Sequence, residues 1–524
     1  MNIFSFSPFG YEGSLVTVEV DLRRGIPAVD LVGLADGAVK ESRERMRSAI
    51  RNSGFDFPLE RVLISLSPAD LKKEGAGFDL AIALAVLDAQ KRSNQSEMQE
   101  DLPFDNILIM GELELSGQIR PVRGVHGAAA TAKSAGINMC IVSSANGDEA
   151  RQVSGMKVFA ASSLAEAFDA LYRPELFKSG VNFGKNSSIP ENSVFVEAVL
   201  FAAESPELEF SDIKGQSRLV RALTIAAAGG HNLLAFGPPG CGKTLAIQKF
   251  PALLPLLTVE EAQSVTRIYS IAGLLSPTMP LMRGAPFRVP HQTASVEGMC
   301  GGGVLCRPGE ISLSHNGVLF LDEAAEFRSS VLQMLRVPIE SGKITLSRAG
   351  RSTVYPANFQ LLMATNPCPC GNYGVPGKIC LCSARSIELY WKKFSGPLLD
   401  RIDLRVAVSI ETSEKEISRA QTTSELRKTV AKAVKIQRTR QGKRNVHLTP
   451  QEIILFCSLG EEEKNFLDNQ TVQKDFSQRA VSGCLKLART IADMEGAEKI
   501  SCAHLKEAVS FRVDAGPLSC AYSE

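Results

Sequence analysis

The sequence predicts an α/β protein in which a parallel sheet carries the chemistry, a separate α/β domain precedes that sheet and a helical domain follows it. Short apolar runs alternate with helical stretches through residues 1–410, which is the pattern of strand and helix units. One apolar run leads into a glycine-rich turn, and another ends in two acids. After residue 410, helical periodicity broken by glycine and proline indicates a small bundle.

Changes in composition predict the domain boundaries. Residues 1–172 combine strand-like runs with helical stretches and would form an α/β domain of their own. The strand-like runs lie at 15–20, 61–65, 106–110 and 139–142, and the helical stretches lie at 38–52, 78–90 and 127–135. Residues 173–204 are rich in Pro, Gly, Asn, Ser and Lys and have few apolar anchors, which predicts a linker. The sheet that carries the chemistry would occupy 205–410 and the helical domain 411–524.

A glycine-rich segment follows the strand predicted at 232–236. Its residues are Gly237, Pro238, Pro239, Gly240, Cys241, Gly242, Lys243 and Thr244. They match the pattern G-x-x-x-x-G-K-[ST], in which backbone N–H groups surround a phosphate at the start of a helix, here expected at 245–250. Lys243 would neutralise phosphate oxygens and the Thr244 hydroxyl would bind Mg²⁺. We therefore expect the chain to bind a nucleoside triphosphate.

An apolar run at 317–321 ends in Asp322 and Glu323. A buried parallel strand would deliver both carboxylates to the carboxyl edge of the sheet. We expect Asp322 to hold Mg²⁺ and Glu323 to polarise the attacking water. An ordinary core strand that ends in polar residues has the same local pattern, but the phosphate loop earlier in the chain favours the hydrolytic interpretation.

Length, charge and cysteine content limit the class of protein. The chain has 524 residues, 44% of them hydrophobic, and a net charge of +1. No apolar run approaches the ~18 residues of a membrane span and the first residues lack a secretory pattern, so we expect a cytoplasmic protein without a membrane partner. The twelve cysteines indicate reduced thiols or metal ligands. With almost no net charge, any nucleic-acid affinity must come from local basic clusters.

The order of these parts resembles the AAA+ ATPases, which implies that ATP is the nucleotide. A further strand-like run at 361–365 ends in Asn366, which by this resemblance would be the sensor that orients the lytic water. Segment 396–403 resembles the one that carries the arginine finger, so Arg401 would act on the γ-phosphate bound by a neighbouring subunit. The resemblance thus implies a ring, a hexamer as in the family.

A second arginine belongs to the same resemblance. Residues 477–480 open a helix and resemble the second sensor, which implies that Arg479 faces the nucleotide. For Arg401 and Arg479 taken singly, a surface ion pair explains the residue equally well. Their positions relative to the other motifs favour the catalytic interpretation.

Two insertions interrupt the core, at 286–312 and 339–356. The second is typical of a β-hairpin, because alternating apolar residues flank a tip of small and basic residues. Hairpins at this place line the central pore in the magnesium-chelatase, MoxR and MCM branch of AAA+ proteins, and Arg348, Arg351 and Lys343 would contact DNA phosphates there. A capped surface hairpin is the alternative. Residues 427–444, with eight Lys/Arg and no Asp/Glu, are a second basic candidate, although such a run is more often a solvated helix face.

The N-terminal domain narrows the resemblance further. Segments 33–36, 39–45, 67–75 and 78–80 resemble the front of the ComM/YifB magnesium-chelatase-like proteins, and the similarity continues at 316–323, 366–371 and 489–493. Segment 111–124 is similar to the Lon-protease fold, which is ribosomal S5 domain 2-like. Lon chemistry needs a Ser nucleophile and a Lys base. The aligned positions hold Asp79 and His126, so we predict a non-proteolytic Lon-like domain.

Membership of the ComM/YifB family implies a hexameric, ATP-driven DNA motor that promotes branch migration in homologous recombination, notably in natural transformation. Its partners would be single-stranded and branched DNA, further copies of itself and recombination proteins. The alternative is an AAA+ ATPase that remodels a protein partner, as chelatase and MoxR relatives do. The Lon-like domain favours the DNA motor.

Four cysteines form two C-x-C pairs separated by nine residues, namely Cys368 with Cys370 and Cys380 with Cys382. Four thiols in a glycine-containing loop have the composition of a structural Zn²⁺ site. Paired cysteines in zinc sites usually have two or more residues between them, so four reduced thiols in a loop are an equal alternative. The six histidines are scattered, and we assign none of them to catalysis.

Overall fold

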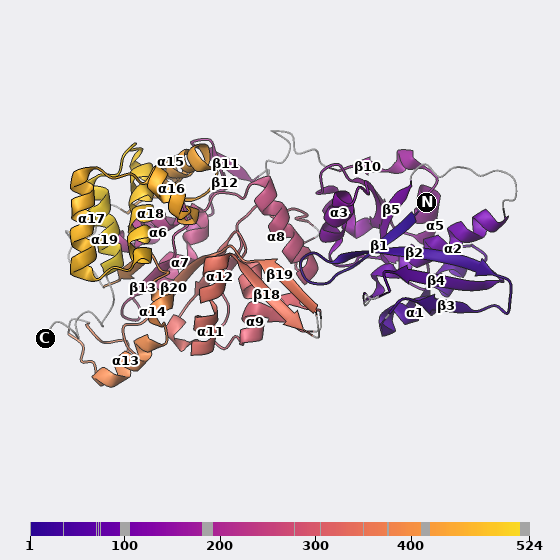
Figure 1. Ribbon diagram of the computed structural model, residues 1–524, viewed down its shortest axis with the longest axis horizontal. Coiled ribbons are helices and arrows are strands. Elements are labelled where there is room, and N and C mark those ends of the chain that lie inside the picture. Colours follow the sequence, from indigo (N-terminus) through magenta and orange to yellow (C-terminus); the bar gives the residue numbers. More distant parts are fainter. Residues whose placement is uncertain are drawn as a thin grey trace.

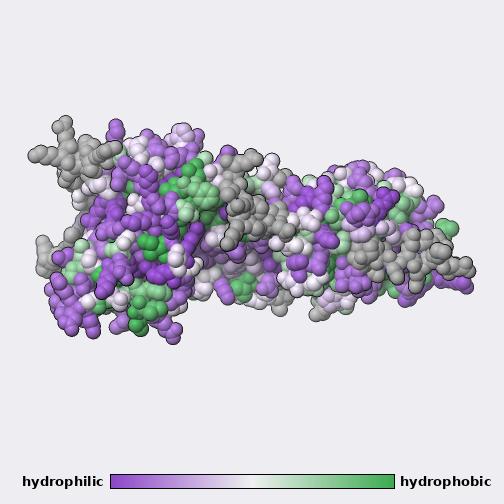
Figure 2. Space-filling model, turned by 90° about the horizontal axis from the view of Figure 1, so that it is seen from above, coloured by the Kyte–Doolittle hydropathy of each residue, from purple (hydrophilic) through white to green (hydrophobic). Residues whose placement is uncertain are grey.

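The computed structural model describes residues 2–34, 36–69, 71, 73, 75–94, 105–180, 192–276, 278–303, 305–348, 351–374, 377–409 and 420–513. The molecule is elongated, with the N-terminal sheet at one end and the C-terminal helices at the other (Figure 1). None of the helices in these ranges combines the length and the apolar character that a membrane crossing requires. Seen at a right angle to that view, the surface is largely hydrophilic and its apolar groups lie in separate patches (Figure 2).

An eight-stranded mixed sheet, in the order β10-β9-β8-β5-β1-β2-β4-β3, organises residues 2–180. Its strands are β1 (Asn2–Ser7), β2 (Ser14–Arg23), β3 (Val29–Val32), β4 (Arg61–Ser67), β5 (Asn106–Met110), β8 (Met139–Ser143), β9 (Lys157–Ala161) and β10 (Lys178–Ser179). The helices of this region are α1 (Gly37–Asn52), α2 (Asp79–Asn94), α3 (Val125–Ser134), α4 (Gly147–Arg151) and α5 (Leu164–Ala170). A short ribbon pairs β6 (Glu112–Leu113) with β7 (Ile119–Arg120).

Helices cover both faces of this sheet. Successive side chains of a strand point to opposite faces, and in β5 Ile107 and Ile109 pack with α1, α2 and α5, whereas Leu108 and Met110 pack with α3. Burial on both sides explains why the predicted strands at 106–110 and 139–142 are continuous apolar runs without alternation. The structure confirms strands and helices at each of the seven predicted N-terminal positions, with ends shifted by up to four residues.

A five-stranded parallel sheet, in the order β14-β17-β20-β13-β21, forms the second part of the chain. Its strands are β13 (Leu233–Phe236), β14 (Phe287–Arg288), β17 (Val318–Leu321), β20 (Gln360–Thr365) and β21 (Leu404–Ala407). The helices around it are α6 (Ser217–Gly229), α7 (Lys243–Gln248), α8 (Val259–Ala272), α9 (Val296–Cys300), α10 (Glu310–Leu313), α11 (Ser329–Met334), α12 (Arg336–Ser341), α13 (Ala384–Lys392) and α14 (Gly396–Leu399). The insertion at 286–312 contains β14, α9, α10 and a ribbon of β15 (Gly301–Gly302) and β16 (Arg307–Pro308).

The C-terminal part is helical, as the sequence predicts. Its helices are α15 (Thr423–Gln441), α16 (Pro450–Phe456), α17 (Glu461–Lys474), α18 (Gln478–Glu495) and α19 (Cys502–Val513). Short 3-10 helices elsewhere in the described chain are η1 (Ala76–Phe78), η2 (Ser144–Asn146), η3 (Pro174–Leu176), η4 (Pro206–Leu208), η5 (Phe210–Asp212), η6 (Phe250–Leu253), η7 (Ala324–Glu326) and η8 (Asn445–His447). Buried residues of α6, α15, α18 and α19 share one core with β13 and β21, so the helices pack directly onto the parallel sheet.

The segment expected as a linker, 173–204, differs from that expectation where it is described. Strand β10 extends the N-terminal sheet by pairing with β9. Strands β11 (Ser193–Val196) and β12 (Val199–Ala202) form a hairpin, and Phe201 in β12 is fully buried in the core of the parallel sheet. A few apolar residues were therefore enough to anchor both ends of this segment, while residues 181–191 lie outside the described residues.

The predicted hairpin at 339–356 is present as β18 (Lys343–Arg348) and β19 (Arg351–Pro356). A loop of the N-terminal domain, between β1 and β2, contacts it. The backbone N–H of Tyr11 donates a hydrogen bond to Thr353 Oγ1 (3.2 Å), and the rings of Tyr11 and Tyr355 meet edge to face with centroids 6.1 Å apart. Strand β19 of the hairpin is therefore supported by the first domain.

Helices α3 and α8 form the other junction between the first domain and the parallel-sheet part. Arg267 of α8 donates hydrogen bonds to Glu12 O (2.9 Å) and Thr131 Oγ1 (3.1 Å), and its guanidinium lies over the Tyr11 ring. Ser270 of α8 donates a hydrogen bond to Glu149, and burial raises the pKa of that carboxyl. The junction is thus polar and specific, and it shares Tyr11 with the hairpin contact.

Gly10 lies so close to the hairpin that a larger side chain would not fit there. Its φ is +60°, and a Cβ built there would lie 1.8 Å from Thr353 Oγ1. We expect Gly10→Ala to displace this loop, because it adds a steric overlap to the roughly 1 kcal/mol cost of a left-handed alanine. Gly54→Ala is the matched control, since Gly54 has φ +84° but open space around it. Gly10→Ala should lower the midpoint of thermal unfolding by clearly more than Gly54→Ala, and equal shifts would contradict this account.

Candidate functional site

The phosphate loop lines a cavity of about 370 Å³ at the carboxyl edge of the parallel sheet. The cavity combines loop residues with the ends of two neighbouring strands. Its lining residues are Pro239, Gly240, Gly242, Lys243, Thr244, Leu245, Asp322, Glu323, Ala364, Thr365 and Asn366. The structure therefore brings the predicted phosphate, magnesium and sensor residues together in one place.

The loop is shaped for close approach of backbone to phosphate. Gly242 precedes α7 in the left-handed conformation (φ +83°), and a Cβ on Gly237 would lie 2.0 Å from Val408 O. Helix α7 begins at Lys243, two residues earlier than predicted, because Lys243 and Thr244 form its first turn. The free N–H groups of that turn point toward the space where an anion binds.

The buried ammonium of Lys243 is held by the loop itself. Its Nζ donates hydrogen bonds to the carbonyl oxygens of Gly237 and Pro238, both at 2.7 Å, and lies 3.5 Å from Asn366 Oδ1. A cation that already sits between the loop and the sensor strand is placed to contact phosphate oxygens.

The acids after β17 have distinct environments. Asp322 accepts a hydrogen bond from Thr244 Oγ1 (3.0 Å), so the two predicted Mg²⁺ ligands already face each other. Glu323 is exposed and adopts a left-handed conformation (φ 48°) at the start of η7. A non-glycine residue in that conformation costs about 1–3 kcal/mol and is typical of functional sites. Glu323 lines the cavity in this conformation.

The position of Asn366 depends on residues that the sequence analysis did not single out. Trp391 of α13 donates a hydrogen bond from Nε1 to Pro367 O (3.0 Å) and packs edge to face on Phe236, with centroids 5.6 Å apart. The hydroxyls of Tyr390 and Thr365 lie 3.0 Å apart. The chain has a single tryptophan, but it lies 25 residues after Asn366, so nothing in the sequence linked it to the sensor.

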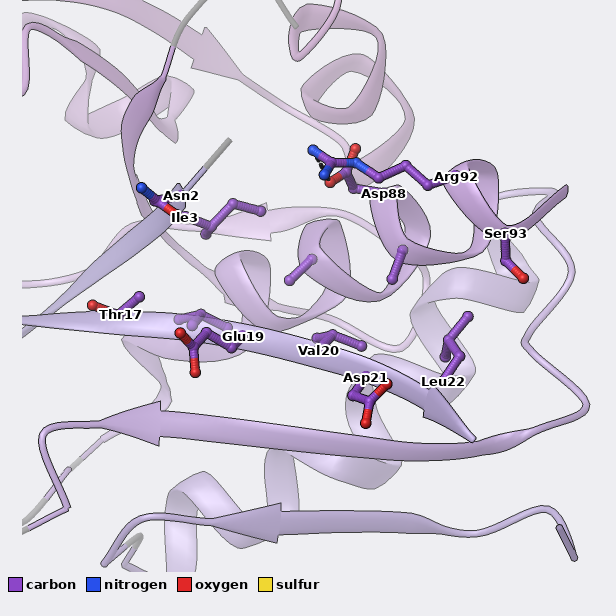
Figure 3. A pocket seen from close by; sticks show the side chains of 13 residues that line it. Asn2, Ile3, Thr17, Glu19, Val20, Asp21, Leu22, Asp88, Arg92 and Ser93 are labelled. Carbon is purple, nitrogen blue, oxygen red and sulfur yellow. Dashed lines mark ion pairs between the residues drawn. The ribbon is translucent and has the colours of Figure 1, made fainter. Parts of the chain in front are cut away.

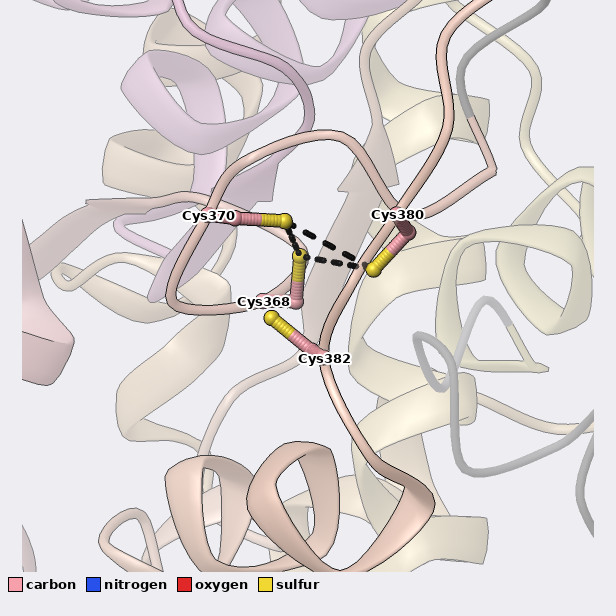
Figure 4. A group of neighbouring side chains, drawn as sticks. All are labelled: Cys368, Cys370, Cys380 and Cys382. Carbon is pink, nitrogen blue, oxygen red and sulfur yellow. Dashed lines mark hydrogen bonds between the residues drawn. The ribbon is translucent and has the colours of Figure 1, made fainter.

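The four predicted cysteines converge just after the sensor strand (Figure 4). Their sulfur atoms all lie within 4.8 Å of one another, and the Cys368 Sγ is 3.4 Å from Cys370 Sγ and 3.7 Å from Cys380 Sγ. Tetrahedral Zn–S bonds of about 2.3 Å would place sulfurs about 3.8 Å apart. The Asn372 N–H and the Cys368 thiol lower the pKa of Cys370 to about 6, whereas hydrogen bonds with Cys370 raise the pKa of Cys380 and Cys382. Without a metal, the cluster therefore favours a thiolate at Cys370 alone. The arrangement fits a four-coordinate metal.

This cysteine loop also touches the phosphate loop. Gly371 has φ +77°, and a Cβ there would lie 2.7 Å from Pro239. The close approach requires glycine at position 371, and it limits the movement of Pro239 in the phosphate loop. The cysteine loop therefore packs against a residue that lines the nucleotide cavity.

Arg401 and Arg479 lie away from the phosphate loop of their own chain. Both are in a second cavity, of about 560 Å³, between the sheet and the C-terminal helices. Both guanidinium groups form ion pairs with one carboxylate, Glu340 of α12. The structure thus places Arg479 beside Arg401 and not among the residues lining the nucleotide cavity. Glu340 was not anticipated, because nothing in the sequence joins α12 to these two arginines.

The basic residues of the hairpin do not form one cluster. Lys343 is the first residue of β18 and pairs with Pro356, whereas Arg348 and Arg351 pair with each other next to the tip. Arg348 is five residues further along β18 than Lys343, which is a distance of about 17 Å. The side chains of Arg348 and Arg351 and the tip residues 349–350 lie outside the described residues.

The second basic candidate, 427–444, is divided between the interior and the surface. Arg427 is buried and donates hydrogen bonds to Ala252 O (2.7 Å) and Ala202 O (2.9 Å). Arg440 pairs with Asp493 at 2.7 Å. Burial lowers the pKa of Arg444, whereas Lys428, Lys432, Lys435 and Arg438 are exposed. The run is therefore partly a solvated helix face, as the sequence favours, and partly a set of links between the helices and the sheet.

The two positions at which the resemblance would place a protease nucleophile and base hold residues that are buried in the first domain. Asp79 at the start of α2 is buried and bonded to Ser42, to Arg45 (2.8 Å) and to the N–H of Leu113 (3.3 Å). His126 is buried, its ring nitrogens have no hydrogen-bond partner, and burial with nearby Arg267 lowers its pKa to about 4. An acid neutralised by an arginine and an uncharged imidazole offer neither a serine nucleophile nor an amine base.

A further cavity of about 470 Å³ lies in the first domain, between β1, β2 and α2 (Figure 3). Acidic side chains line it, and one of them, Asp88, pairs with Arg92 at 3.0 Å. None of the residues predicted for catalysis, metal or DNA binding lines this cavity.

Three protein-family models match the chain. The model described as magnesium chelatase, subunit ChlI, matches residues 209–416. Models described as subunit ChlI of Mg-chelatase and magnesium chelatase, subunit ChlI C-terminal, match residues 18–146 and 420–512. The matches cover the N-terminal sheet, the parallel sheet and the helical part in turn.

Curated proteins match over nearly the whole length. The chain is 38% identical to competence protein ComM of Haemophilus influenzae over 515 residues, which is 97% of each chain. It is 38% identical to uncharacterized protein YifB of Escherichia coli, over 96% of this chain and 95% of that one. Similarity to the magnesium-chelatase 38 kDa subunit of Acidiphilium rubrum is 30% identity over 30% of this chain and 52% of that one.

Similarity of this extent, together with a phosphate loop, acidic strand and sensor assembled in one cavity, decides the family. Family membership also implies ATPase activity with Mg²⁺. The chain belongs to the ComM/YifB family of magnesium-chelatase-like AAA+ ATPases.

Proposed function

We propose that this protein is a hexameric, ATP-driven DNA motor of the cytoplasm that promotes branch migration in homologous recombination, including natural transformation. The observation that carries the proposal is the near full-length similarity to a competence protein, in a chain whose nucleotide site is assembled. Single-stranded and branched DNA would be its substrates, and recombination proteins its further partners.

The residues of the nucleotide cavity have separate tasks in this proposal. Lys243 binds phosphate oxygens, and Thr244 and Asp322 hold Mg²⁺, which when bound neutralises charge on the phosphates. Glu323 takes the proton of the attacking water, because it is the exposed acid at the cavity opening. Asn366, 3.5 Å from Lys243, orients that water.

The two arginines complete the site of a neighbouring subunit. Among the described residues that line the nucleotide cavity, none is an arginine, whereas Arg401 and Arg479 lie together in the other cavity. A guanidinium supplied by the next subunit would stabilise charge that develops on the γ-phosphate. This arrangement supports a ring rather than a monomer.

The domains would divide this work. Residues 1–172 would be a non-proteolytic Lon-like domain, since Asp79 and His126 occupy the positions of the protease dyad. Residues 173–204 would connect it to the AAA+ core at 205–410, and residues 411–524 would form the helical lid. The hairpin at 343–356 would face the DNA, with its basic tip as the contact.

A remodelling ATPase that acts on a protein partner is the second candidate. The similarity to a magnesium-chelatase subunit over 30% of the chain favours it. The two candidates differ in whether DNA raises ATP turnover.

Glu323→Gln tests the hydrolytic assignment. We expect the variant to bind ATP normally, because the phosphate and metal ligands remain, and to lose turnover by about two orders of magnitude or more. Steady-state phosphate release and retention of labelled ATP would be measured. Glu326→Gln is the matched control, an exposed acid in η7 that does not line the cavity. Turnover near the wild-type rate in Glu323→Gln would refute the assignment.

The role of the hairpin in DNA binding is tested with substitutions at its tip and, separately, at its base. Arg348→Ala with Arg351→Ala should lower DNA affinity, flatten the slope of log K against log salt by roughly two units, and reduce DNA-stimulated turnover and branch migration together. Lys343→Ala should change the slope by at most about one unit, because Lys343 stands at the base. ATPase without DNA should survive in both variants.

Normal branch migration by the tip variant at physiological salt would remove the hairpin as the DNA contact. A wild-type protein that neither binds DNA nor is stimulated by it would favour the remodelling ATPase.

We also propose a structural Zn²⁺ on the four-cysteine cluster. The protein purified without chelator should contain about one zinc per chain by elemental analysis. Cys370→Ser should lose that metal and lower the unfolding temperature, whereas Cys502→Ser, a half-buried cysteine outside the cluster, should keep it. Protein that contains no metal and titrates with four additional reactive thiols would contradict the proposal.

A further inference from the structure

Glu340 receives two arginines that come from different parts of the fold. Its carboxylate accepts from Arg401, which follows α14, and from Arg479, in the first turn of α18. Glu340 and Arg479 are half-exposed, while the side chain of Arg401 is 12% exposed. One partly exposed carboxylate therefore forms ion pairs with two arginines at the edge of a cavity of about 560 Å³.

The two arginines are held side by side without help from Glu340. Asp400, next to Arg401, accepts hydrogen bonds from Ser477 Oγ (3.2 Å), which caps α18, and from Arg512 (3.0 Å). The carbonyl oxygen of Arg401 accepts a hydrogen bond from Asn232 Nδ2 (3.0 Å). These contacts fix the backbone of both arginines to the sheet and to the helical part. Without Glu340, Arg401 would keep its hydrogen bond to Pro397 O (2.5 Å), and the Arg479 guanidinium would be released.

Glu340 is joined rigidly to the hairpin. It lies in the last turn of α12, three residues before the first residue of β18. Ser341 Oγ donates to Lys343 O (3.0 Å) and accepts from Lys343 N–H (3.2 Å), and the Ala357 N–H donates to Gly342 O (2.7 Å). A shift of Glu340 would therefore be transmitted to both ends of the hairpin through bonded backbone.

The Glu340 carboxylate binds the two guanidinium groups in the way that a phosphate would. Hydrogen bonds from Arg401, and then from Arg479, lower the pKa of Glu340, so it is ionised at neutral pH. The Arg401 Nε is buried and has no hydrogen-bond partner, so this guanidinium retains an unused donor. A triphosphate with several anionic oxygens would satisfy more of these donors than one carboxylate.

We propose that Glu340 is a positioning residue that competes with the neighbouring subunit's nucleotide for Arg401 and Arg479, and that this exchange links the nucleotide state to the hairpin β18–β19. The inference rests on the proposed action of Arg401 across the subunit interface. Without a nucleotide at that interface, Glu340 holds the arginines and α12 keeps the hairpin in its present position. When the phosphates take the arginines, Glu340 is released and the hairpin is free to move.

Glu340→Gln separates this role from a merely structural one. Because coupling between two sites is reciprocal, DNA that moves the hairpin would also loosen Glu340 from the arginines. The variant keeps the shape of the side chain but removes the charge, so the arginines become available without that step. We expect the DNA-free ATPase rate per subunit to rise about three- to tenfold, the change expected when two exposed ion pairs no longer compete. The ratio of DNA-stimulated to DNA-free rate should fall toward one. A structural role would lower both rates and leave the ratio unchanged.

Two controls accompany this measurement. Glu388→Gln removes an exposed ion pair with Lys392, and its side-chain exposure of 48% matches the 52% of Glu340, so its rates should equal those of the wild type. Glu340→Gln combined with Arg401→Ala should lose the gain, because the gain acts through Arg401. An unchanged or lower DNA-free rate in Glu340→Gln, or a gain that persists without Arg401, would overturn the inference.

A failure of the proposed motor function can be distinguished from a failure of the inference about Glu340. If DNA does not stimulate the wild-type protein, the motor proposal fails, while the DNA-free rates of Glu340→Gln still decide the role of Glu340. Mixing Arg401→Ala subunits with Lys243→Ala subunits tests the action across the interface, because a mixed interface pairs an intact loop with an intact arginine. Recovered ATPase supports the inference, and its absence in verified mixed rings removes it.

Discussion

The level at which three neighbouring parallel strands end is the constraint on which the nucleotide site depends. Phe236 at the end of β13 is opposite Thr365 at the end of β20, and Leu321 at the end of β17 is opposite Met363. The phosphate loop, the sensor and the two acids therefore emerge at one edge although they are far apart in sequence. A slip of one residue in β20 would turn its side chains to the opposite face and remove Asn366 from the cavity.

The same constraint explains what could be predicted from the sequence. Each of these strands carries a local signal, an apolar run followed by a polar residue, and the parallel sheet converts three local signals into one site. The four-cysteine cluster was predictable for a similar reason, since all its members lie within one loop. The apolar run at 106–110 likewise predicted a strand, and the structure adds that this strand is buried on both faces.

Features that arise from contacts between distant segments could not be predicted. The position of Arg479 follows from the packing of α18 against Asp400, which no periodicity encodes. Glu340 belongs to a helix whose sequence gives no indication of two arginine partners. The basic run of α15 has the exposed lysines that a solvated face predicts, but the sequence does not show that Arg427 donates hydrogen bonds to carbonyl oxygens of η6 and β12. Anchoring of 173–204 by Phe201 is a tertiary effect of the same kind.

The hairpin has supports on both of its strands, and this pattern bears on how a motor of this kind would work. Strand β19 contacts the first domain through Thr353 and Tyr355, while β18 is continuous with α12 and Glu340. The first domain therefore holds one strand, and the arginine pair holds the other through Glu340. If Glu340 is released while the contact at Tyr11 persists, the hairpin would pivot about β19 rather than slide as a whole. The tip, farthest from that contact, would then move most, and the tip is where the arginines of the hairpin lie.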